Sequence, residues 1–329
     1  MILITGATGL VGANLCYTLT QSKQSIVALY RRESKRDATR DFFEKKGDQN
    51  GALFNSIIWR KADLNNHAEM TDAFKGITHV YHCAAYISMA QFKLEQLTRV
   101  NQQGTADLVN LCIENKIQKL AYVSSIAALG ADTLENRIDE ETPWNPTKEK
   151  TGYSYSKYGA ELEVWRASQE GVPIVIVNPG VILGVGMPRN PLDQLIDRIK
   201  KGLVFYPTGK TGYVAVEDVV QVLINLMNSS IENERFILVS ENWTYKKILN
   251  YMAKALNKKE AKRPLHPSYL YSFWIIESIL SALGLRKKFL SRALINSLCD
   301  SNEIDGKKIT TKLDFKYRPI QKYLESLGY

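Results

Sequence analysis

The sequence predicts an α/β protein built on a doubly wound parallel sheet with helices on both faces. Its first half alternates short apolar segments with helical patterns, which is typical of parallel strands joined by crossover helices. The strands that we expect cover residues 1–5, 25–30, 56–61, 79–83, 119–124 and 173–177. The helices expected between them cover residues 9–22, 36–46, 67–74, 94–115 and 153–169.

The amino-terminal segment carries the most specific signal. An apolar run over residues 1–4 is followed by the turn Thr5-Gly-Ala-Thr-Gly-Leu-Val-Gly12 and then by a helical pattern. A strand, a glycine turn and a helix start present free N–H groups and a positive helix end to a pyrophosphate, which is the arrangement of the Rossmann dinucleotide-binding fold. The first glycine would allow the tight turn, the second the approach of the phosphates, and the third close packing of helix and strand. We therefore expect cofactor contacts from Gly6, Thr8, Gly9, Leu10, Val11 and Gly12.

A basic turn follows the second expected strand, in the segment Ala28-Leu29-Tyr30-Arg31-Arg32. Sheets of this kind that prefer NAD carry an acidic residue here, which binds the ribose 2′-hydroxyl, whereas an arginine suits the 2′-phosphate of NADP. Because no carboxylate occurs before Glu33, Arg31 and Arg32 favour NADP(H), with NAD(H) as the alternative. The turn can also be interpreted as an ordinary solvent-exposed basic turn.

Small and polar residues follow the third and fourth expected strands. Asp63 can accept a hydrogen bond from the adenine amino group and can also cap the next helix, since the two roles are compatible, and Leu64 lies beside it. Ala84 and Ala85 end the fourth strand, and their small side chains would let the middle of the cofactor lie against the backbone. The residues after them that we expect to face the substrate are Tyr86, Ser88 and Met89.

A serine pair after the fifth strand, Ser124-Ser125, precedes a Tyr-x-x-x-Lys pattern formed by Tyr153 and Lys157. The tyrosine and the lysine are four residues apart on an expected helix, so their side chains project from one face. A tyrosine with its ordinary pKa of about 10 is a weak proton donor at neutral pH, and a nearby ammonium lowers that pKa by stabilising the phenolate. A serine hydroxyl would hold the substrate oxygen against the tyrosine. The same spacing also occurs in ordinary surface pairs, and the order of the motifs along the chain favours a catalytic site.

From about residue 184 the alternation of strands and helices loosens. Residues 212–227 return to a strand followed by a helix, and residues 236–240 predict a further strand. We expect a dinucleotide-binding domain and a smaller, discontinuous substrate-binding domain, made respectively of residues 1–183 with 212–240 and of residues 184–211 with 241–329.

The most apolar stretch of the second half covers residues 269–285, YLYSFWIIESILSALGL, and ends in Arg286-Lys287-Lys288. It is short for a transmembrane helix and contains Glu277. The favoured interpretation is a core helix of the second domain. The alternatives are a wall of a hydrophobic substrate cleft, or a helix on a membrane surface with the basic cluster toward the lipid headgroups.

The composition is that of an ordinary globular protein of 329 residues, with 45% hydrophobic and 23% charged residues. The net charge of +9 is scattered, without the aromatic-interleaved basic stripe of a nucleic-acid-binding module, so we expect no nucleic-acid partner. The four cysteines show no C-x-x-C pairing, which favours reduced thiols in a cytoplasmic protein, and we expect no metal site. We also expect no signal peptide, because the first residues already form a strand.

The motifs TGATGLVG, KADL, HCAAY, VSSIAALG, YSYSK and NPG, in this order, resemble those of the extended short-chain dehydrogenases/reductases of the NAD-dependent epimerase/dehydratase type, over essentially the whole chain. The resemblance implies that Ser125 orients the substrate and that Tyr153 is the acid/base. It implies that Lys157 lowers the pKa of Tyr153 and binds the nicotinamide ribose. Further residues match family positions: Asn101, counted with the catalytic group, and Ser124, Pro179 and Gly180 beside the cofactor.

Three departures narrow this resemblance. Ile126-Ala127 stand where the dehydratases carry an Asp-Glu pair, which disfavours elimination of water. Residues 177–184 resemble the ketone and alcohol reductases more than the sugar epimerases, and Ala215 replaces a family histidine. The features are most similar to dihydroflavonol-reductase-like and 3β-hydroxysteroid-dehydrogenase-like members.

The favoured function is therefore an NADP(H)-dependent oxidoreductase that transfers a hydride between nicotinamide and a ketone or secondary alcohol of a fairly apolar small molecule. The alternative is a nucleotide-sugar epimerase with tightly bound NAD, which uses the same residues. A non-enzymatic dinucleotide sensor is disfavoured, because it has no need of Ser125, Tyr153 and Lys157 together. The resemblance also implies a homodimer.

Overall fold

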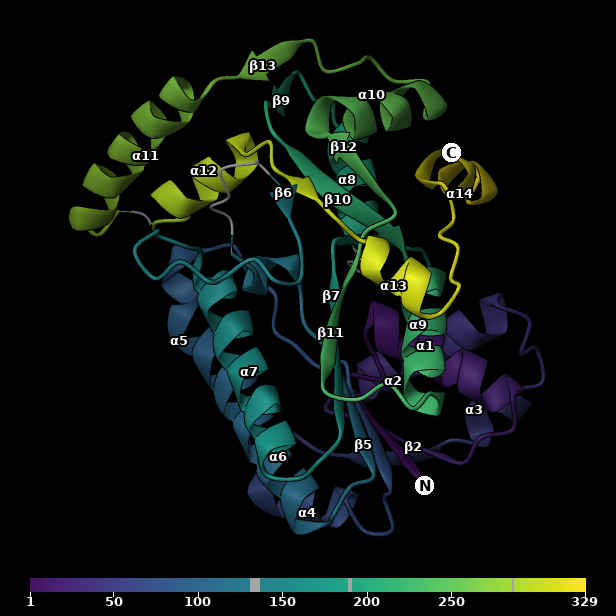
Figure 1. The fold of residues 1–329 in the computed structure, drawn as a ribbon. Coiled ribbons are helices and arrows are strands. Elements are labelled where there is room, and N and C mark those ends of the chain that lie inside the picture. The colour runs from purple at the N-terminus through teal and green to yellow at the C-terminus, as the bar shows by residue number, and fades with distance from the viewer. Residues whose placement is uncertain (131–136, 189–190, 286) are drawn as a thin grey trace.

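The computed structural model describes residues 1–130, 137–188, 191–285 and 287–329. Its centre is a parallel sheet of seven strands in the order β11-β7-β5-β4-β1-β2-β3 (Figure 1). The doubly wound α/β fold that the sequence predicts is confirmed, and all six expected strands are present. With the seventh, they are β1 (Ile2–Thr5), β2 (Ile26–Tyr30), β3 (Ile58–Lys61), β4 (His79–His82), β5 (Lys119–Val123), β7 (Ile174–Pro179) and β11 (Glu234–Leu238).

Two buried cores cover the faces of this sheet, and successive residues of a strand face opposite cores: Ile4 packs in one and Leu3 in the other. The helices on the side of Ile4 are α1 (Leu10–Gln21), α2 (Glu33–Lys45), α3 (Ala52–Asn55) and α9 (Val216–Asn228). The helices on the side of Leu3 are α4 (His67–Ala73), α6 (Gly104–Glu114) and α7 (Gly152–Gln169). Figure 1 shows α6 and α7 on one side of the sheet and α1, α3 and α9 on the other.

The helix expected over residues 94–115 is divided into three parts. Helix α5 (Leu94–Leu97) runs into a π-helical segment, η2 (Thr98–Gln103), and then into α6. The π-helical turn widens the backbone around Asn101, which is only 2% exposed. A hydrophobic pattern reports the period of a helix and carries no signal for such an insertion, so the sequence predicts one continuous helix.

The rest of the chain forms a smaller unit around a three-stranded sheet. This sheet has the order β12-β10-β8 and contains β8 (Val181–Leu183), β10 (Lys210–Ala215) and β12 (Glu241–Thr244). Its core is completed by α8 (Pro191–Lys200), α10 (Tyr245–Ala255) and α14 (Ile320–Ser326). Two short strand pairs join more distant segments: β9 (Phe205–Pro207) with β13 (Arg263–Leu265), and β6 (Arg137–Ile138) with β14 (Glu303–Ile304).

The chain passes between the two units at the β10–α9 junction. β10 belongs to the three-stranded sheet, whereas α9, which follows it directly, packs on α1. On α9 the buried Asp218 accepts a hydrogen bond of 2.9 Å from the backbone N–H of Arg318 and pairs with its guanidinium, which ties the carboxyl-terminal segment to the central unit. The residue boundaries of the two expected domains stay a prediction.

The remaining helices are α11 (Pro267–Ala282), α12 (Arg292–Cys299) and α13 (Lys307–Lys312). Helix α11 packs on α12 and projects from the upper left of the molecule in Figure 1. The prediction that this apolar stretch is a core helix is wrong: of its side chains, only Leu270 and Glu277 are buried. No helix in the described part of the chain is long and apolar enough to cross a membrane.

Candidate active site

The glycine turn lies where the strand order reverses, between β1 and its neighbour β4. Gly6 has a φ of +66°, and a Cβ there would lie 2.6 Å from the backbone nitrogen of Ala84 at the end of β4. A Cβ on Gly12 would lie 2.2 Å from the carbonyl oxygen of Gly6. Only glycine fits either position. Without side chains at these two positions, the glycine turn packs its backbone directly against the residues after β4 and against the first turn of α1.

This turn has the chemistry of a pyrophosphate site. Helix α1 begins after the exposed Gly9, and within the described residues 1–130 no side chain caps it and no acidic residue lies in its first turn. Its first N–H groups and the positive end of its dipole are thus left for an anion. Thr8 and Leu10 are half-buried beside the turn, and Val11 is buried beneath it.

Arg31 and Asp63 meet at the carboxyl ends of β2 and β3. Arg31 Nη1 lies 3.4 Å from Asp63 Oδ2, and both side chains are partly exposed, at 52% and 38%. Arg32 is exposed and precedes α2 as its N-cap residue. Asn66, not Asp63, caps α4, since its Oδ1 accepts the Glu69 N–H at 3.3 Å. The prediction that Asp63 caps this helix is therefore wrong.

Leu64 and the pair Pro179-Gly180 lie at two other strand ends. Leu64 follows β3 and packs against Gly104 at the start of α6. Pro179 is the last residue of β7, and Gly180 donates its N–H to the carbonyl oxygen of Leu238 at 3.0 Å. A Cβ on Gly180 would lie 2.4 Å from the carbonyl oxygen of Gly212, so glycine lets β7 and β10 come together here.

Tyr153 and Ser125 form the centre of the site. Tyr153 is 9% exposed in the first turn of α7, where Thr151 Oγ1 caps the helix by accepting the Ser154 N–H at 3.1 Å. Burial raises the pKa of the Tyr153 phenol to about 12, while a hydrogen bond with the Ser125 side chain lowers it. Ser125 follows β5 and accepts the Ala127 N–H at 3.1 Å. The structure thus brings together a serine and a tyrosine that lie 28 positions apart in the chain.

Lys157 lies one helical turn beyond Tyr153 and is 1% exposed. Its ammonium donates hydrogen bonds to Tyr122 Oη at 2.7 Å and to the carbonyl oxygen of Val123 at 2.8 Å, both on β5. Burial lowers the pKa of Lys157 to about 7, and the charge of Glu161 opposes this effect. The ammonium of Lys157 is thus directed at β5. The expectation that Lys157 gives Tyr153 a lowered pKa is not met, because burial raises the pKa of the Tyr153 phenol above its ordinary value.

Asn101 positions the loop after β4. Its Oδ1 accepts the N–H of Tyr86 at 2.7 Å, and its Nδ2 donates to the carbonyl oxygen of Tyr86 and to Ser156 Oγ, both at 2.9 Å. The side chain thus joins η2, the β4 loop and α7, which is the work of a positioning residue. In that loop Tyr86 and Ser88 are half-buried, while Ala85 and Met89 are exposed.

A buried histidine that the sequence analysis missed connects the same elements. His82 Nδ1 lies 2.7 Å from Thr5 Oγ1, and its Nε2 lies 2.9 Å from Thr105 Oγ1. Thr105 donates to the carbonyl oxygen of Asn101, and Thr5 accepts the N–H of Ala84 at 3.3 Å. If Nε2 carries the proton of a neutral His82, it donates to Thr105 Oγ1, while Nδ1 accepts the hydroxyl proton of Thr5. This single tautomer satisfies every donor and acceptor in the row of hydrogen bonds from Thr5 to Asn101.

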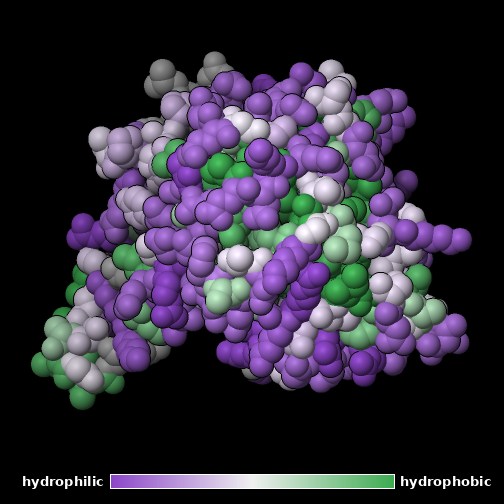
Figure 2. Space-filling view, turned by 90° about the horizontal axis from the view of Figure 1, so that it is seen from below, coloured by the Kyte–Doolittle hydropathy of each residue, from purple (hydrophilic) through white to green (hydrophobic). Residues whose placement is uncertain are grey.

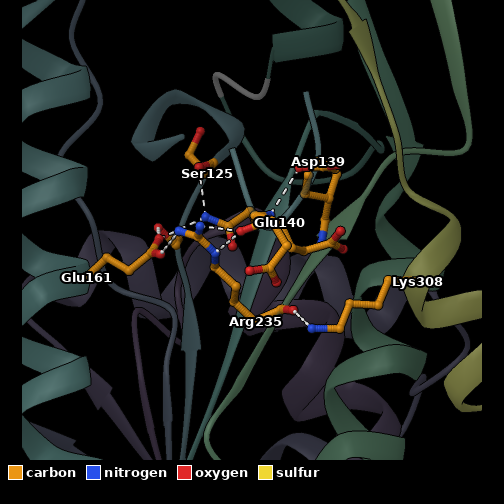
Figure 3. A network of polar contacts seen from close by, with 10 residues as sticks. Ser125, Asp139, Glu140, Glu161, Arg235 and Lys308 are labelled. Atoms are coloured by element: carbon orange, nitrogen blue, oxygen red, sulfur yellow. Dashed lines mark hydrogen bonds and ion pairs between the residues drawn. The ribbon is translucent and has the colours of Figure 1, made fainter. Parts of the chain in front are cut away.

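The sequence analysis also missed Glu161, which binds Ser124 directly and is linked to Ser125 through Asn178. Its Oε2 accepts hydrogen bonds from Ser124 Oγ at 2.6 Å and from Asn178 Nδ2 at 2.8 Å, and its Oε1 lies 3.2 Å from Arg235 Nη1. Asn178 Nδ2 also donates to the carbonyl oxygen of Ser125 at 3.1 Å. Figure 3 shows Glu161 and Arg235 directed at each other, with Glu140 beside them. The only signal in the sequence is that Glu161 lies four residues after Lys157, on the same helix face.

All four cysteines are free and lie in described residues, and Cys16 and Cys112 are buried. Burial raises the pKa of Cys83, at the end of β4, to about 12. In residues 1–130, 137–188, 191–285 and 287–329 no three His, Cys, Asp or Glu side chains are grouped so as to hold a metal ion.

A family model for the NAD-dependent epimerase/dehydratase family matches residues 2–238. The chain belongs to this family. It is an NAD(P)-dependent enzyme of the extended short-chain dehydrogenase/reductase type. The resemblance found in the sequence is thereby confirmed, as is the prediction of an enzyme.

Individual proteins are similar over most of the chain. A Synechocystis sp. protein named "Putative dihydroflavonol 4-reductase" is 29% identical over 290 residues, 85% of this chain and 80% of the relative. Sterol demethylase protein B of Methylococcus capsulatus is 25% identical over 282 residues, 84% of this chain and 81% of the relative. The crystal structure of gox2253 is similar with a TM-score of 0.80 and 25% identity, and covers 98% of this chain and 94% of its own.

Proposed function

We propose that this enzyme is an NADP(H)-dependent oxidoreductase acting on a ketone or secondary alcohol of a fairly apolar small molecule, with Tyr153 as acid/base. The observation that carries the proposal is the buried contact between Tyr153 and Ser125, with the buried Lys157 one helical turn further along α7. Ser125 follows β5 at the carboxyl edge of the central sheet, the edge at which the glycine turn follows β1. The three side chains match the needs of proton transfer to a developing alkoxide.

Ser125, Tyr153 and Lys157 each have a different role in the proposed proton transfer. When bound, the nicotinamide supplies or accepts the hydride. In the direction of reduction, Tyr153 gives its proton to the carbonyl oxygen of the substrate, and Ser125 holds that oxygen by a hydrogen bond. Because burial raises the pKa of Tyr153 to about 12, its phenol carries the proton at neutral pH. The nearby ammonium of Lys157 then stabilises the phenolate that remains.

The basic turn supports NADP(H) as the cofactor. Arg31 and Arg32 follow β2, and no carboxylate precedes Glu33. The pair of Arg31 with Asp63 is exposed and has an N–O distance of 3.4 Å, so its strength is about 0–1 kcal/mol. A 2′-phosphate offers Arg31 shorter, doubly charged hydrogen bonds and would outcompete this partner, leaving Asp63 for the adenine.

The loop after β4 supports an apolar substrate. Asn101 fixes Tyr86 and also bonds to Ser156 on α7, the helix of Tyr153, and Ser88 and Met89 follow Tyr86 in the same loop. The loop thus offers an aromatic and a thioether side chain to a substrate. Relatives named for a dihydroflavonol and for a sterol favour the same chemistry.

The second candidate is a nucleotide-sugar epimerase with tightly bound NAD, which the name of the matching family favours. Such an enzyme would use Ser125, Tyr153 and Lys157 to oxidise and then reduce one sugar, with no net use of cofactor. Protein that retains NAD through gel filtration and consumes none with any carbonyl compound would support the epimerase. Protein that binds NADPH reversibly and oxidises it with a ketone would support the reductase.

The proposal is tested by Tyr153→Phe, with Tyr158→Phe as the matched control. Tyr158 lies on the same helix but stacks on Trp144, with ring centroids 4.1 Å apart, and is not part of the proposed site. After a screen of ketones with NADPH, we expect Tyr153→Phe to reduce turnover by roughly a hundredfold or more, with NADPH binding measured by fluorescence nearly unchanged. Tyr158→Phe should retain both. Wild-type turnover by Tyr153→Phe would refute the mechanism.

A further inference from the structure

Helix α11 exposes an apolar face to the surroundings. Six large apolar residues on it have exposed fractions between 47 and 66%: Tyr269, Phe273, Ile275, Ile276, Ile279 and Leu283, the last just beyond its end. Their spacing of three, four and seven residues places them on one broad side of the helix. Figure 2 shows hydrophobic residues gathered on a projection at the left of the molecule, the side on which Figure 1 places α11. A contiguous apolar surface of this kind marks an interaction site.

The opposite side of α11 fixes this orientation. Glu277 is 2% exposed, and its Oε2 accepts the N–H of Leu290 at 2.7 Å. Leu270, two turns earlier, is also buried. Rotating α11 to bury its apolar face would break the Glu277 hydrogen bond and leave that N–H without its partner. The chain therefore places a carboxylate toward the protein and its isoleucines outward, the reverse of an ordinary surface helix.

Cations lie on the other side of α11, the side on which Leu270 and Glu277 are buried. Lys288 and Arg292 lie over the ring of Trp274 on α11, at 4.5 and 4.7 Å from its centroid. Lys287 is exposed and lies 5.5 Å from the ring of Phe92, which is itself 48% exposed. Such aromatic and basic pairs are suited to the boundary between lipid headgroups and acyl chains, where the ring is apolar and the cation meets phosphate.

The loop after β4 also exposes apolar side chains. Phe92, which contacts Lys287 five residues beyond the end of α11, belongs to the segment after β4 in which Ile87 is 65% and Met89 is 42% exposed. The same segment contains Tyr86, which Asn101 holds. The contact of Lys287 with Phe92 thus brings the segment after α11 to the loop that we expect to contact the substrate.

We propose that the apolar face of α11 rests in the interface of an anionic lipid bilayer, with Lys287, Lys288 and Arg292 on its headgroups. A bilayer matches both components of the surface, because apolar side chains partition into the acyl boundary and clustered cations bind anionic headgroups. The helix lies in the plane of the interface. If the proposed function holds, an apolar substrate passes from the bilayer past Ile87 and Met89 to Tyr153.

The test is flotation of the full chain with vesicles of phosphatidylcholine alone and of phosphatidylcholine with phosphatidylglycerol. We expect binding to the anionic vesicles that weakens as salt is added. The double variant Ile276→Ser/Ile279→Ser should reduce the partition coefficient by roughly tenfold or more, whereas Ile58→Ser, at a 43% exposed position on β3, should leave it unchanged. Lys287→Gln/Lys288→Gln should reduce binding to anionic vesicles but not the weaker binding to neutral ones.

Three results would overturn the proposal: no flotation of the wild type, equal flotation of the Ile276→Ser/Ile279→Ser variant, or a lipid-free oligomer in light scattering that this variant converts to monomer. The last result would assign the face to a second copy of the chain. Reduction of a water-soluble ketone without vesicles separates this proposal from the proposed function. Flotation of the wild type without turnover of any ketone would support the membrane-binding surface and contradict the proposed reductase function.

Discussion

The ammonium of Lys157 lies 2.7 Å from the phenol oxygen of Tyr122 and 4.4 Å from the centroid of the same ring. This contact anchors the lysine to β5, directly before the serine pair, so the position of Lys157 depends on the sheet as well as on its helix. It also places a cation in a buried site, where charge is costly unless it is hydrogen-bonded. The consequence is that the protonation of Lys157 is sensitive to pH near neutrality.

The first prediction concerns the pH dependence of turnover. Burial lowers the pKa of Lys157 to about 7, so the ammonium loses its proton as pH rises through about 7. We expect the rate of ketone reduction with NADPH to fall over the same interval, because the neutral amine no longer stabilises the phenolate of Tyr153. In Lys157→Arg the guanidinium stays charged, and this alkaline decline should disappear. Rates measured from about pH 5.5 to 9.5 check this, and an unchanged decline in Lys157→Arg would contradict it.

The second prediction concerns cofactor choice. Arg31→Ala should weaken binding of NADPH by roughly tenfold or more and leave NADH binding unchanged, since only the 2′-phosphate is lost as a partner. Fluorescence titration measures both. Lys75→Ala is the control, because Lys75 is 74% exposed and lies before β4, at the amino edge of the sheet. Equal losses for the two cofactors would show that Arg31 does not select the phosphate.

The third prediction concerns the support behind the serine pair. Glu161→Gln should lower the free energy of unfolding by about 2–4 kcal/mol, because it removes a buried carboxylate with three partners, Arg235 among them. Glu163→Gln is the matched control on the same helix. Its partner Arg166 lies 2.9 Å away, and both side chains are partly exposed, so we expect a change within about 0.5 kcal/mol. Urea unfolding compares the two, and losses of equal size would contradict the role given to Glu161.

The fourth prediction concerns acid stability. Burial, aided by the charge of Lys157, lowers the pKa of His82 to about 3 in the folded protein. A histidine in the unfolded chain has a pKa of about 6.5. Between this value and the folded pKa, the unfolded chain binds more protons than the folded one, so the free energy of unfolding decreases as the pH is lowered. His82 alone should lower the free energy of unfolding by roughly 2–3 kcal/mol between about pH 7 and about pH 4.5.

Urea unfolding at these two pH values checks the contribution of His82. His82→Gln should reduce the difference between them by that amount, although the variant is less stable at both. His67→Gln, at an exposed position on α4, should retain the wild-type difference. A His82→Gln variant with the full wild-type difference would assign the acid sensitivity to other groups.

The sequence determined the central sheet and the residues along its edge. Alternation of apolar strands with helical patterns suffices for a parallel sheet, because each strand must bury both faces. Gly6 and Gly12 are local requirements of one turn, and they are visible in the sequence because no other residue fits their backbone approach. The order of the glycine turn, serine pair, tyrosine and lysine then placed the candidate site at the carboxyl edge.

Only the tertiary structure decided which partners those residues have. His82 meets Thr5 through the β1–β4 pairing, and Glu161 on α7 meets Arg235 on the edge strand β11, so neither contact has a signature in local spacing. Likewise, a run of apolar residues in α11 is compatible with a core helix or an exposed one. The hydrogen bond between Glu277 and the N–H of Leu290 decided which side of α11 faces the protein. A buried carboxylate must keep its hydrogen-bond donor, and the apolar side chains on the opposite side of the helix are exposed as a result.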